Sequence, residues 1–133
     1  MKILVTGGCG YIGSHAVVSL LNSGFEPVVF DNLSNSSSVS LDRVFDITGR
    51  EVDFYKGDLT CLDDLDRVFS LHKFEAVIHF AGLKSVSESV SNPLKYYSNN
   101  VSGSINLIET MKKYGVTRFI FSSSATVYGE QSK

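Results

Sequence analysis

The sequence predicts an α/β fold, in which a doubly wound, mostly parallel sheet carries helices on both faces. Short apolar runs rich in β-branched residues alternate with segments whose apolar side chains recur at helical spacing. The connections between these segments are short, as βα units require. The first strand-like run passes into the first helix-like segment through glycines at positions 7, 8, 10 and 13. With 133 residues, 43% of them hydrophobic, we expect one domain with one core.

The segment from Gly7 to Gly13, which we call the glycine turn, joins a predicted strand at 2–5 to a predicted helix at 11–22. The start of a helix offers N–H groups without intrahelical partners and the positive end of the helix dipole. Glycines there let the backbone approach a diphosphate and let the helix pack closely on the strand. An ordinary tight turn would need glycines too, but the strand and helix on either side favour a diphosphate cradle. We expect the buried face of this helix to carry Ile12, Ala16, Leu20 and Leu21.

Four more strands are predicted, at 27–30, 52–55, 76–80 and 118–121, and three more helices, at 39–45, 63–69 and 94–114. Right-handed crossovers give the strand order three-two-one-four-five, a Rossmann-type arrangement. Its ligand crevice lies outside the carboxyl ends of strands one and four. The unusual loops all fall on that edge: the glycine turn, Asp31, Asp58, Phe80 to Lys84, and Ser122 to Ser124.

Asp31, at the end of the second predicted strand, indicates which dinucleotide binds. A carboxylate there accepts hydrogen bonds from the adenosine ribose hydroxyls and repels a 2′-phosphate. No Arg or Lys lies between Asp31 and Leu41 to offset that repulsion. We therefore predict NAD in preference to NADP.

Other polar residues leave alternatives open. Asp58 would accept the adenine amino group or close an Asx turn after Gly57. Lys84 would meet a phosphate or ribose oxygen, or be an ordinary surface lysine. Asparagine is a poor helix former, so we expect Asn99 or Asn100 to face something polar, such as the cofactor. His79 alternates with apolar neighbours, which favours a hydrogen-bonded core histidine over a catalytic base.

Composition excludes several classes of function. A net charge of −2 gives no polyanion-binding surface, so we expect no nucleic-acid partner. No apolar run reaches the roughly 18 residues of a membrane span, and the N-terminus is a predicted strand, so we expect a cytoplasmic protein. Asp63, Asp64 and Asp66 complement the dipole at a helix start, and we predict no metal site. Cys9 fits a small residue filling the turn better than a redox switch.

Six stretches carry a resemblance to a known family. They are Thr6 to His15, Asp31-Asn32-Leu33, Gly57-Asp58-Leu59, His79 to Lys84, Tyr96 to Val101, and Phe121 to Gly129. The chain resembles extended short-chain dehydrogenase/reductases over all of Met1 to Lys133. Within that family, HFAGLK and SSSATVYG are similar to the epimerases that interconvert UDP-glucose and UDP-galactose.

The resemblance implies a tightly held NAD that takes hydride from carbon four of the hexose and returns it to the other face. Ser124 matches the catalytic serine, which hydrogen-bonds the reacting hydroxyl; on position alone it would be a turn serine. Together, the glycine motif and the resemblance assign cofactor contacts to Gly7, Gly10, Tyr11, Ile12, Gly13, Asp31, Asn32, Asn35, Ser36, Asp58, Leu59, Phe80, Ala81, Gly82, Lys84, Asn99 and Ser122.

One departure concerns the family's base, a tyrosine four positions before a lysine that lowers the tyrosine pKa. No Tyr-x-x-x-Lys occurs in these 133 residues. We therefore expect the N-terminal part of a longer enzyme, without its substrate domain and homodimeric when complete. The alternative is a truncated, catalytically inactive NAD-binding module. In either case the fifth strand would be an exposed edge, and the chain should self-associate or be marginally stable.

Overall fold

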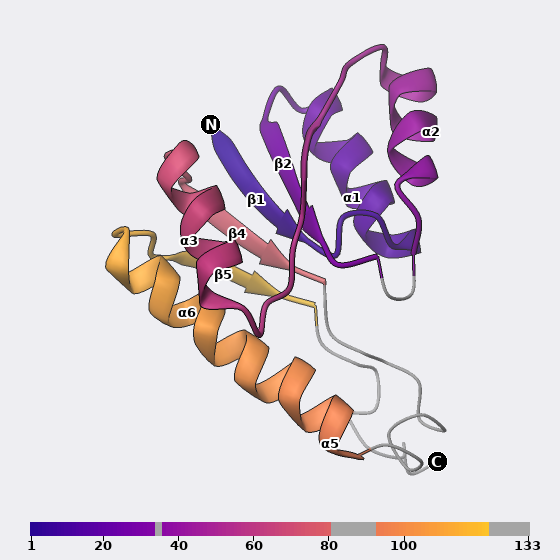
Figure 1. Cartoon of the computed structure of the whole chain (residues 1–133). Coiled ribbons are helices and arrows are strands. Elements are labelled where there is room, and N and C mark those ends of the chain that lie inside the picture. The colour runs from indigo at the N-terminus through magenta and orange to yellow at the C-terminus, as the bar shows by residue number, and fades with distance from the viewer. Residues whose placement is uncertain (34–35, 81–92, 123–133) are drawn as a thin grey trace, which may run out of the picture.

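The computed structural model describes residues 1–33, 36–80 and 93–122. Five strands form one parallel sheet in the order β3-β2-β1-β4-β5, which confirms the predicted fold and strand order (Figure 1). The strands are β1 (Lys2–Thr6), β2 (Glu26–Asp31), β3 (Asp53–Lys56), β4 (Ala76–His79) and β5 (Arg118–Phe121).

Helices cover both faces of the sheet (Figure 1). The helices of the described residues are α1 (Tyr11–Asn22), α2 (Val39–Thr48), α3 (Leu62–Leu71), α5 (Pro93–Tyr96) and α6 (Gly103–Lys113), with a π-helical segment, η1 (Tyr97–Ser102), between the last two. The core has two layers because successive strand residues face opposite sides. Leu4 joins the layer under α3 and α6, whereas Val5 joins the layer under α1 and α2.

The prediction of one uninterrupted α-helix over 94–114 is wrong, because six of those residues form the π-helical segment η1. Asparagines 99 and 100 are poor α-helix formers, so the wider turn falls where the α-helical preference is weak. The α-helix resumes at Gly103, which is buried against Leu59. A Cβ at Gly103 would lie 3.0 Å from the Cβ of Leu59, so this residue lets α6 approach the loop that follows β3 closely.

The buried face of α1 also differs from the prediction. Gly13, Val17 and Leu21 face the sheet, and the Ile12 side chain is 55% exposed. Of the four predicted core residues only Leu21 is fully buried, and Ala16 and Leu20 are half-buried. The apolar residues of α1 span most of its surface, so hydrophobic spacing alone could not fix its rotation. The close contact at Gly13 sets that rotation, by bringing this side of the helix against the turn.

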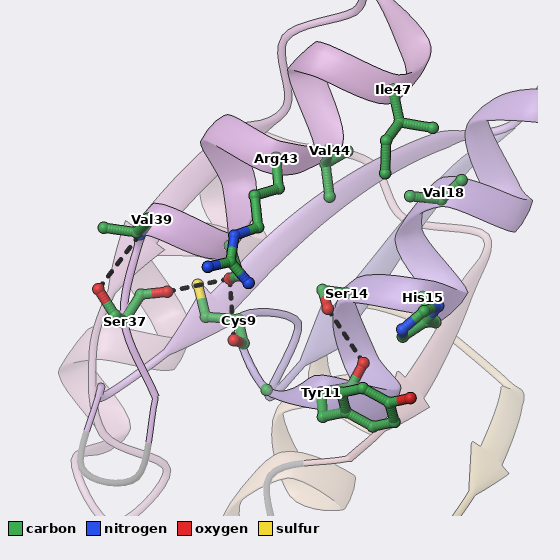
Figure 2. A pocket seen from close by; sticks show the side chains of 12 residues that line it. Cys9, Tyr11, Ser14, His15, Val18, Ser37, Val39, Arg43, Val44 and Ile47 are labelled. Atoms are coloured by element: carbon green, nitrogen blue, oxygen red, sulfur yellow. Dashed lines mark hydrogen bonds between the residues drawn. The ribbon is translucent and has the colours of Figure 1, made fainter.

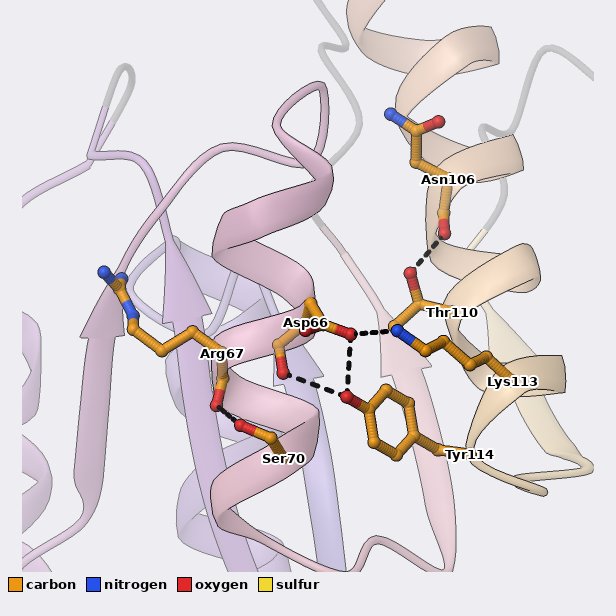
Figure 3. A network of polar contacts seen from close by, with 7 residues as sticks. All are labelled: Asp66, Arg67, Ser70, Asn106, Thr110, Lys113 and Tyr114. Atoms are coloured by element: carbon orange, nitrogen blue, oxygen red, sulfur yellow. Dashed lines mark hydrogen bonds and ion pairs between the residues drawn. The ribbon is translucent and has the colours of Figure 1, made fainter.

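An exposed polar network ties α3 to the end of α6 (Figure 3). Asp66 Oδ1 accepts hydrogen bonds from Lys113 Nζ and from the Tyr114 hydroxyl, both at 2.7 Å. These two donors lower the pKa of the Asp66 carboxyl, and the same contacts raise the pKa of Lys113 and of Tyr114. Because the groups are solvated, the network orients the two helices more than it stabilises them.

Among the strands that the structure describes, β5 is the outer one and pairs with β4 alone. Its Ile120 side chain is 59% exposed, although isoleucine is usually a core residue. The expected apolar edge is therefore present. Self-association through that edge stays a prediction.

Candidate functional site

The glycine turn leaves β1 at its carboxyl end and folds tightly against its own helix. Gly7 has φ of 74°, a left-handed conformation that favours glycine, and its N–H donates to Phe30 O at 2.8 Å. A Cβ built on Gly13 would lie 2.1 Å from the carbonyl oxygen of Gly7, so no larger residue fits there without a backbone shift. The turn thus brings the start of α1 to the edge of the sheet beside β2.

The first turn of α1 is open to an anion. Gly10 is its N-cap and provides no side-chain cap, and no acidic residue occupies the first turn. The first N–H groups of a helix have no intrahelical partner, and the helix dipole adds positive potential at that end. Tyr11 and Ile12 therefore offer backbone donors with little side-chain obstruction. This cradle fits a diphosphate, as the sequence predicts.

Asp31 lies at the end of β2, beside the turn, and is only 7% exposed. Its Oδ2 accepts the Cys9 N–H at 3.1 Å, and its Oδ1 accepts the Leu33 N–H at 2.8 Å and the Ser36 hydroxyl at 3.2 Å. A carboxylate has about four acceptor sites, and donors among the described residues occupy three of those of Asp31, which leaves capacity for a ribose hydroxyl. Leu33 adopts a left-handed φ of 61°, a strained conformation that its hydrogen bond to Asp31 helps to hold.

The Cys9 thiol is buried within the turn. Burial, and next the charge of Asp31, raise the pKa of Cys9 to about 12, against a smaller lowering by a hydrogen bond with Ser40. A thiol held in its protonated form is a poor nucleophile. The structure thus favours the turn-filling role of Cys9 over a redox switch.

Backbone hydrogen bonds continue past the strand ends and align the other predicted loops along the same edge. Gly57 N–H donates to Asp31 O at 3.2 Å, Phe80 N–H to Thr6 O at 2.8 Å, and Ser122 N–H to His79 O at 3.1 Å. Phe80 and Ser122 are half-buried. The edge therefore brings together the ends of all five strands, in the order that the sheet topology requires.

Asp58 and Leu59 follow β3 at the far side of this edge. Asp58 Oδ1 accepts the Thr60 N–H at 2.9 Å, which is the Asx turn considered as the alternative. Leu59 is buried in the core, and its carbonyl oxygen accepts a hydrogen bond from Asn106 Nδ2 at 3.0 Å. Contacts of both residues with adenine stay predictions.

His79 is a core histidine, as predicted. Its ring is buried, with Nδ1 hydrogen-bonded to Thr6 Oγ1 and Nε2 3.2 Å from Ser104 Oγ. The Ser104 hydroxyl also bonds the carbonyl oxygen of Asn100, at 2.6 Å. Sequence reasoning missed Thr6 and Ser104, which join β1 and α6 through this ring. A buried histidine predicts that its ring has hydrogen-bond partners, but the sequence does not identify them.

Several predicted positions lie outside the described residues: Asn35, Ala81, Gly82, Lys84 and Ser124. Asn99 lies in η1, and only its backbone is described. Asn32 directly follows the end of β2, beside Asp31. The adenosine side of the candidate site is therefore described in side-chain detail, and the predicted catalytic serine is not described.

Two kinds of site are not found within residues 1–33, 36–80 and 93–122. No three His, Cys, Asp or Glu side chains in these ranges come together in a way that could hold a metal ion. No helix in the same ranges combines the length and the apolar character needed to cross a membrane.

This fold, with an open helix start beside an anchored carboxylate, defines a dinucleotide-binding protein of the Rossmann type. The profile of the NAD dependent epimerase/dehydratase family matches residues 3–133, and the chain belongs to that family. Among curated relatives, the UDP-glucose 4-epimerase of Bacillus subtilis (strain 168) is 62% identical over 129 residues. That match covers 97% of this chain and 38% of the relative, so the chain spans about two fifths of the length of the relatives it matches.

Solved structures of epimerases have the same fold. The UDP-glucose 4-epimerase of Bifidobacterium longum, in complex with NAD+ and UDP, is 49% identical with a TM-score of 0.94, covering 97% of this chain and 38% of that chain. The enzyme of Stenotrophomonas maltophila, with bound NAD and formylated UDP-arabinopyranose, is 46% identical with a TM-score of 0.95, covering 100% and 40%. Both structures contain NAD, the cofactor predicted from Asp31.

Proposed function

We propose that residues 1–133 form the NAD-binding domain of a UDP-glucose 4-epimerase, which interconverts UDP-glucose and UDP-galactose. The observation that carries the proposal is the anchored Asp31 carboxylate beside the open first turn of α1. The fold alone would not suffice, because Rossmann-type sheets serve many reactions. The identity of 62% with an enzyme of that name supports the choice of reaction.

Each part of the edge has a role in this proposal. The glycine turn binds the cofactor diphosphate, and Asp31 binds the adenosine ribose. When bound, NAD supplies an acceptor for the hydride at sugar carbon four. Phe80 and Ser122 line the pocket farther along the edge, and Asn99 and Lys84 complete it. Ser124 hydrogen-bonds the reacting hydroxyl. The complete enzyme acts in galactose metabolism, in the cytoplasm, as a homodimer.

Calorimetric titration of the 133-residue chain with NAD tests the cofactor half of the proposal. We expect binding, and we expect Asp31→Ala to weaken it by about tenfold or more, since it removes hydrogen bonds to a charged group. Asp42→Ala, on the exposed side of α2, is the matched control and should stay within about twofold of the wild type, because surface charges contribute little. Circular dichroism confirms that both variants are folded. A wild-type chain that binds no NAD would refute the proposal.

A second candidate function is an NAD-binding module without catalysis. No Tyr-x-x-x-Lys pair occurs in these 133 residues, and in this alternative they bind NAD without turning over a sugar nucleotide. We expect the chain alone to bind NAD and to leave UDP-galactose unchanged, which a coupled assay for UDP-glucose measures. A coding sequence that continues beyond Lys133 through such a pair would favour the epimerase, and turnover by the 133 residues alone would contradict the assigned need for that pair.

A further inference from the structure

A groove of about 470 Å³ lies between α1 and α2, on the outer side of the glycine turn (Figure 2). Cys9, Gly10 and Tyr11 line it from the turn, and Ser37, Ser40 and Arg43 line it from the start of α2. The cofactor contacts assigned above leave most of these side chains unused. The groove is therefore a candidate for a second ligand group next to the dinucleotide.

The charge of the groove suits an anion. Arg43 lines it together with His15, and none of the described residues that line it is acidic. The Arg43 side chain extends toward the turn (Figure 2), and it has no hydrogen bond or ion pair with any residue that the structure describes. An arginine fork without a carboxylate partner is the geometry that binds phosphate in a bidentate manner. The chain as a whole has a charge of −2, so this positive groove is a local feature.

Cys9 connects the groove to the ribose position. Its N–H donates to Asp31 Oδ2 at 3.1 Å, and its carbonyl oxygen accepts the Ser40 hydroxyl at 2.8 Å. Cys9 therefore lies between Asp31 and the groove. A substituent on the ribose that Asp31 binds would need to extend only past Cys9 to reach the groove. That substituent is at the 2′ position, because Asp31 is where a dinucleotide fold distinguishes a 2′-hydroxyl from a 2′-phosphate.

We propose that this groove accepts the 2′-phosphate of NADP and that Arg43 is its ligand. The inference rests on the proposed function. Asp31 still favours NAD, because it repels a 2′-phosphate, and Arg43 opposes that effect from the other side of Cys9. The chain then binds NADP more weakly than NAD, but binds it specifically. Arg43 is thus a specificity-determining residue that partly offsets the discrimination imposed by Asp31.

Two nucleotides that differ only by the phosphate in question provide the sharpest test. The chain is titrated with 5′-AMP and with adenosine 2′,5′-bisphosphate, and then with NAD and NADP. We expect Arg43→Gln to weaken the bisphosphate and NADP by about tenfold, the loss of one charged hydrogen-bonding ligand, and to leave AMP and NAD within about twofold. Arg67→Gln, on α3 and outside the groove, is the matched control and should change none of the four.

The outcomes separate this inference from the proposed function. If NAD binds and Arg43→Gln changes all four affinities equally or none, or if NADP does not bind at all, the groove assignment is wrong and the proposed function stands. If NAD itself does not bind, both fail. A titration with inorganic phosphate tests whether the groove instead binds free phosphate. Loss of its binding in Arg43→Gln, with unchanged affinity for the bisphosphate, would make the groove a free phosphate site and overturn the proposal.

Discussion

The two sides of the sheet edge differ in how completely their strands are paired and covered. At the adenosine side, β1 and β2 pair with strands on both sides and are covered on both faces, and Val5 has no exposed surface. At the other side, β5 has one neighbour among the described strands, and Ile120 is 59% exposed. The same alternation of strand residues produces a closed core in one place and a bare apolar edge in the other.

This difference separates the residues expected to bind the cofactor from the residues expected to carry out the reaction. The predicted diphosphate cradle and the Asp31 carboxylate are held by contacts among the first 40 residues or so. The reacting end of the cofactor is expected beside Ser122 and Ser124, next to the exposed strand. The adenosine side should therefore behave as an independent binding site, and the β5 side as a surface that needs cover.

The largest effect is expected at Gly13, where the adenosine side is packed most tightly. In Gly13→Ala the new Cβ would lie 2.1 Å from Gly7 O, so α1 must move away from the turn. We expect a loss of about 2–3 kcal/mol in the free energy of unfolding, typical of overpacking, and at least a hundredfold loss of NAD affinity. Urea unfolding and calorimetry measure these two quantities.

Gly10→Ala is the matched control for stability, because its Cβ would make an ordinary contact of 3.4 Å with the same oxygen and Gly10 has a φ of −73°. Its free energy of unfolding should change by less than about 1 kcal/mol. Equal destabilisation by the two alanines would show that the fit of α1 against the turn is not what holds the cradle.

An intermediate effect is expected on the β5 side. We expect the wild-type chain to self-associate at micromolar concentrations, and Ile120→Lys to shift it toward monomer, because a charge on an edge strand opposes pairing. Sedimentation velocity over a concentration series measures this. Ile47→Lys is the control, because Ile47 is 69% exposed but lies on α2, away from the sheet edge. A wild-type chain that stays monomeric would contradict the prediction that the β5 side is a self-associating edge.

The smallest effect is expected at His72, at the opposite end of the strands, which should make the free energy of unfolding depend on pH. His72 Nδ1 lies 3.2 Å from Lys2 Nζ, and its Nε2 lies 2.8 Å from the Tyr55 hydroxyl. Burial, and then the charge of Lys2, lower the pKa of His72, against a smaller raising by Asp53. The unfolded chain, with a histidine pKa of about 6.5, then binds more protons than the folded chain just below that pH.

The contribution of His72 to the free energy of unfolding should therefore be fully present above about pH 6.5. It should be lost as the pH drops from there toward the folded-state pKa of His72. Urea unfolding between pH 5 and 7 measures this slope, which His72→Gln should reduce. Lys2→Met should raise the His72 pKa, as read from the NMR shift of the ring protons. An unchanged slope in His72→Gln would assign the pH dependence to other groups.

The fold was predictable because its signals are local. Each strand is a short apolar run, and right-handed crossovers leave few strand orders to consider. The π-helical segment η1 and the rotation of α1 were not predictable, because both depend on how a helix fits its neighbours. At the site, the positions of Asp31 and the glycines follow from the end of a strand and the start of a helix. Arg43 was not predictable, because it is distant from Cys9 in the chain and only the packing of α2 brings both residues to one groove.

The strand order could be read from the sequence, which also predicts the edge on which ligands bind and names Asp31 as the carboxylate expected to favour NAD. These follow from hydrophobic periodicity and from the chemistry of a few residues, which act over a few positions of chain. The donors that hold Asp31, the partners of His79 and the direction of the Arg43 side chain came only from the folded structure. Those contacts join residues that are distant in the chain, and their geometry is set by close packing that no local pattern records.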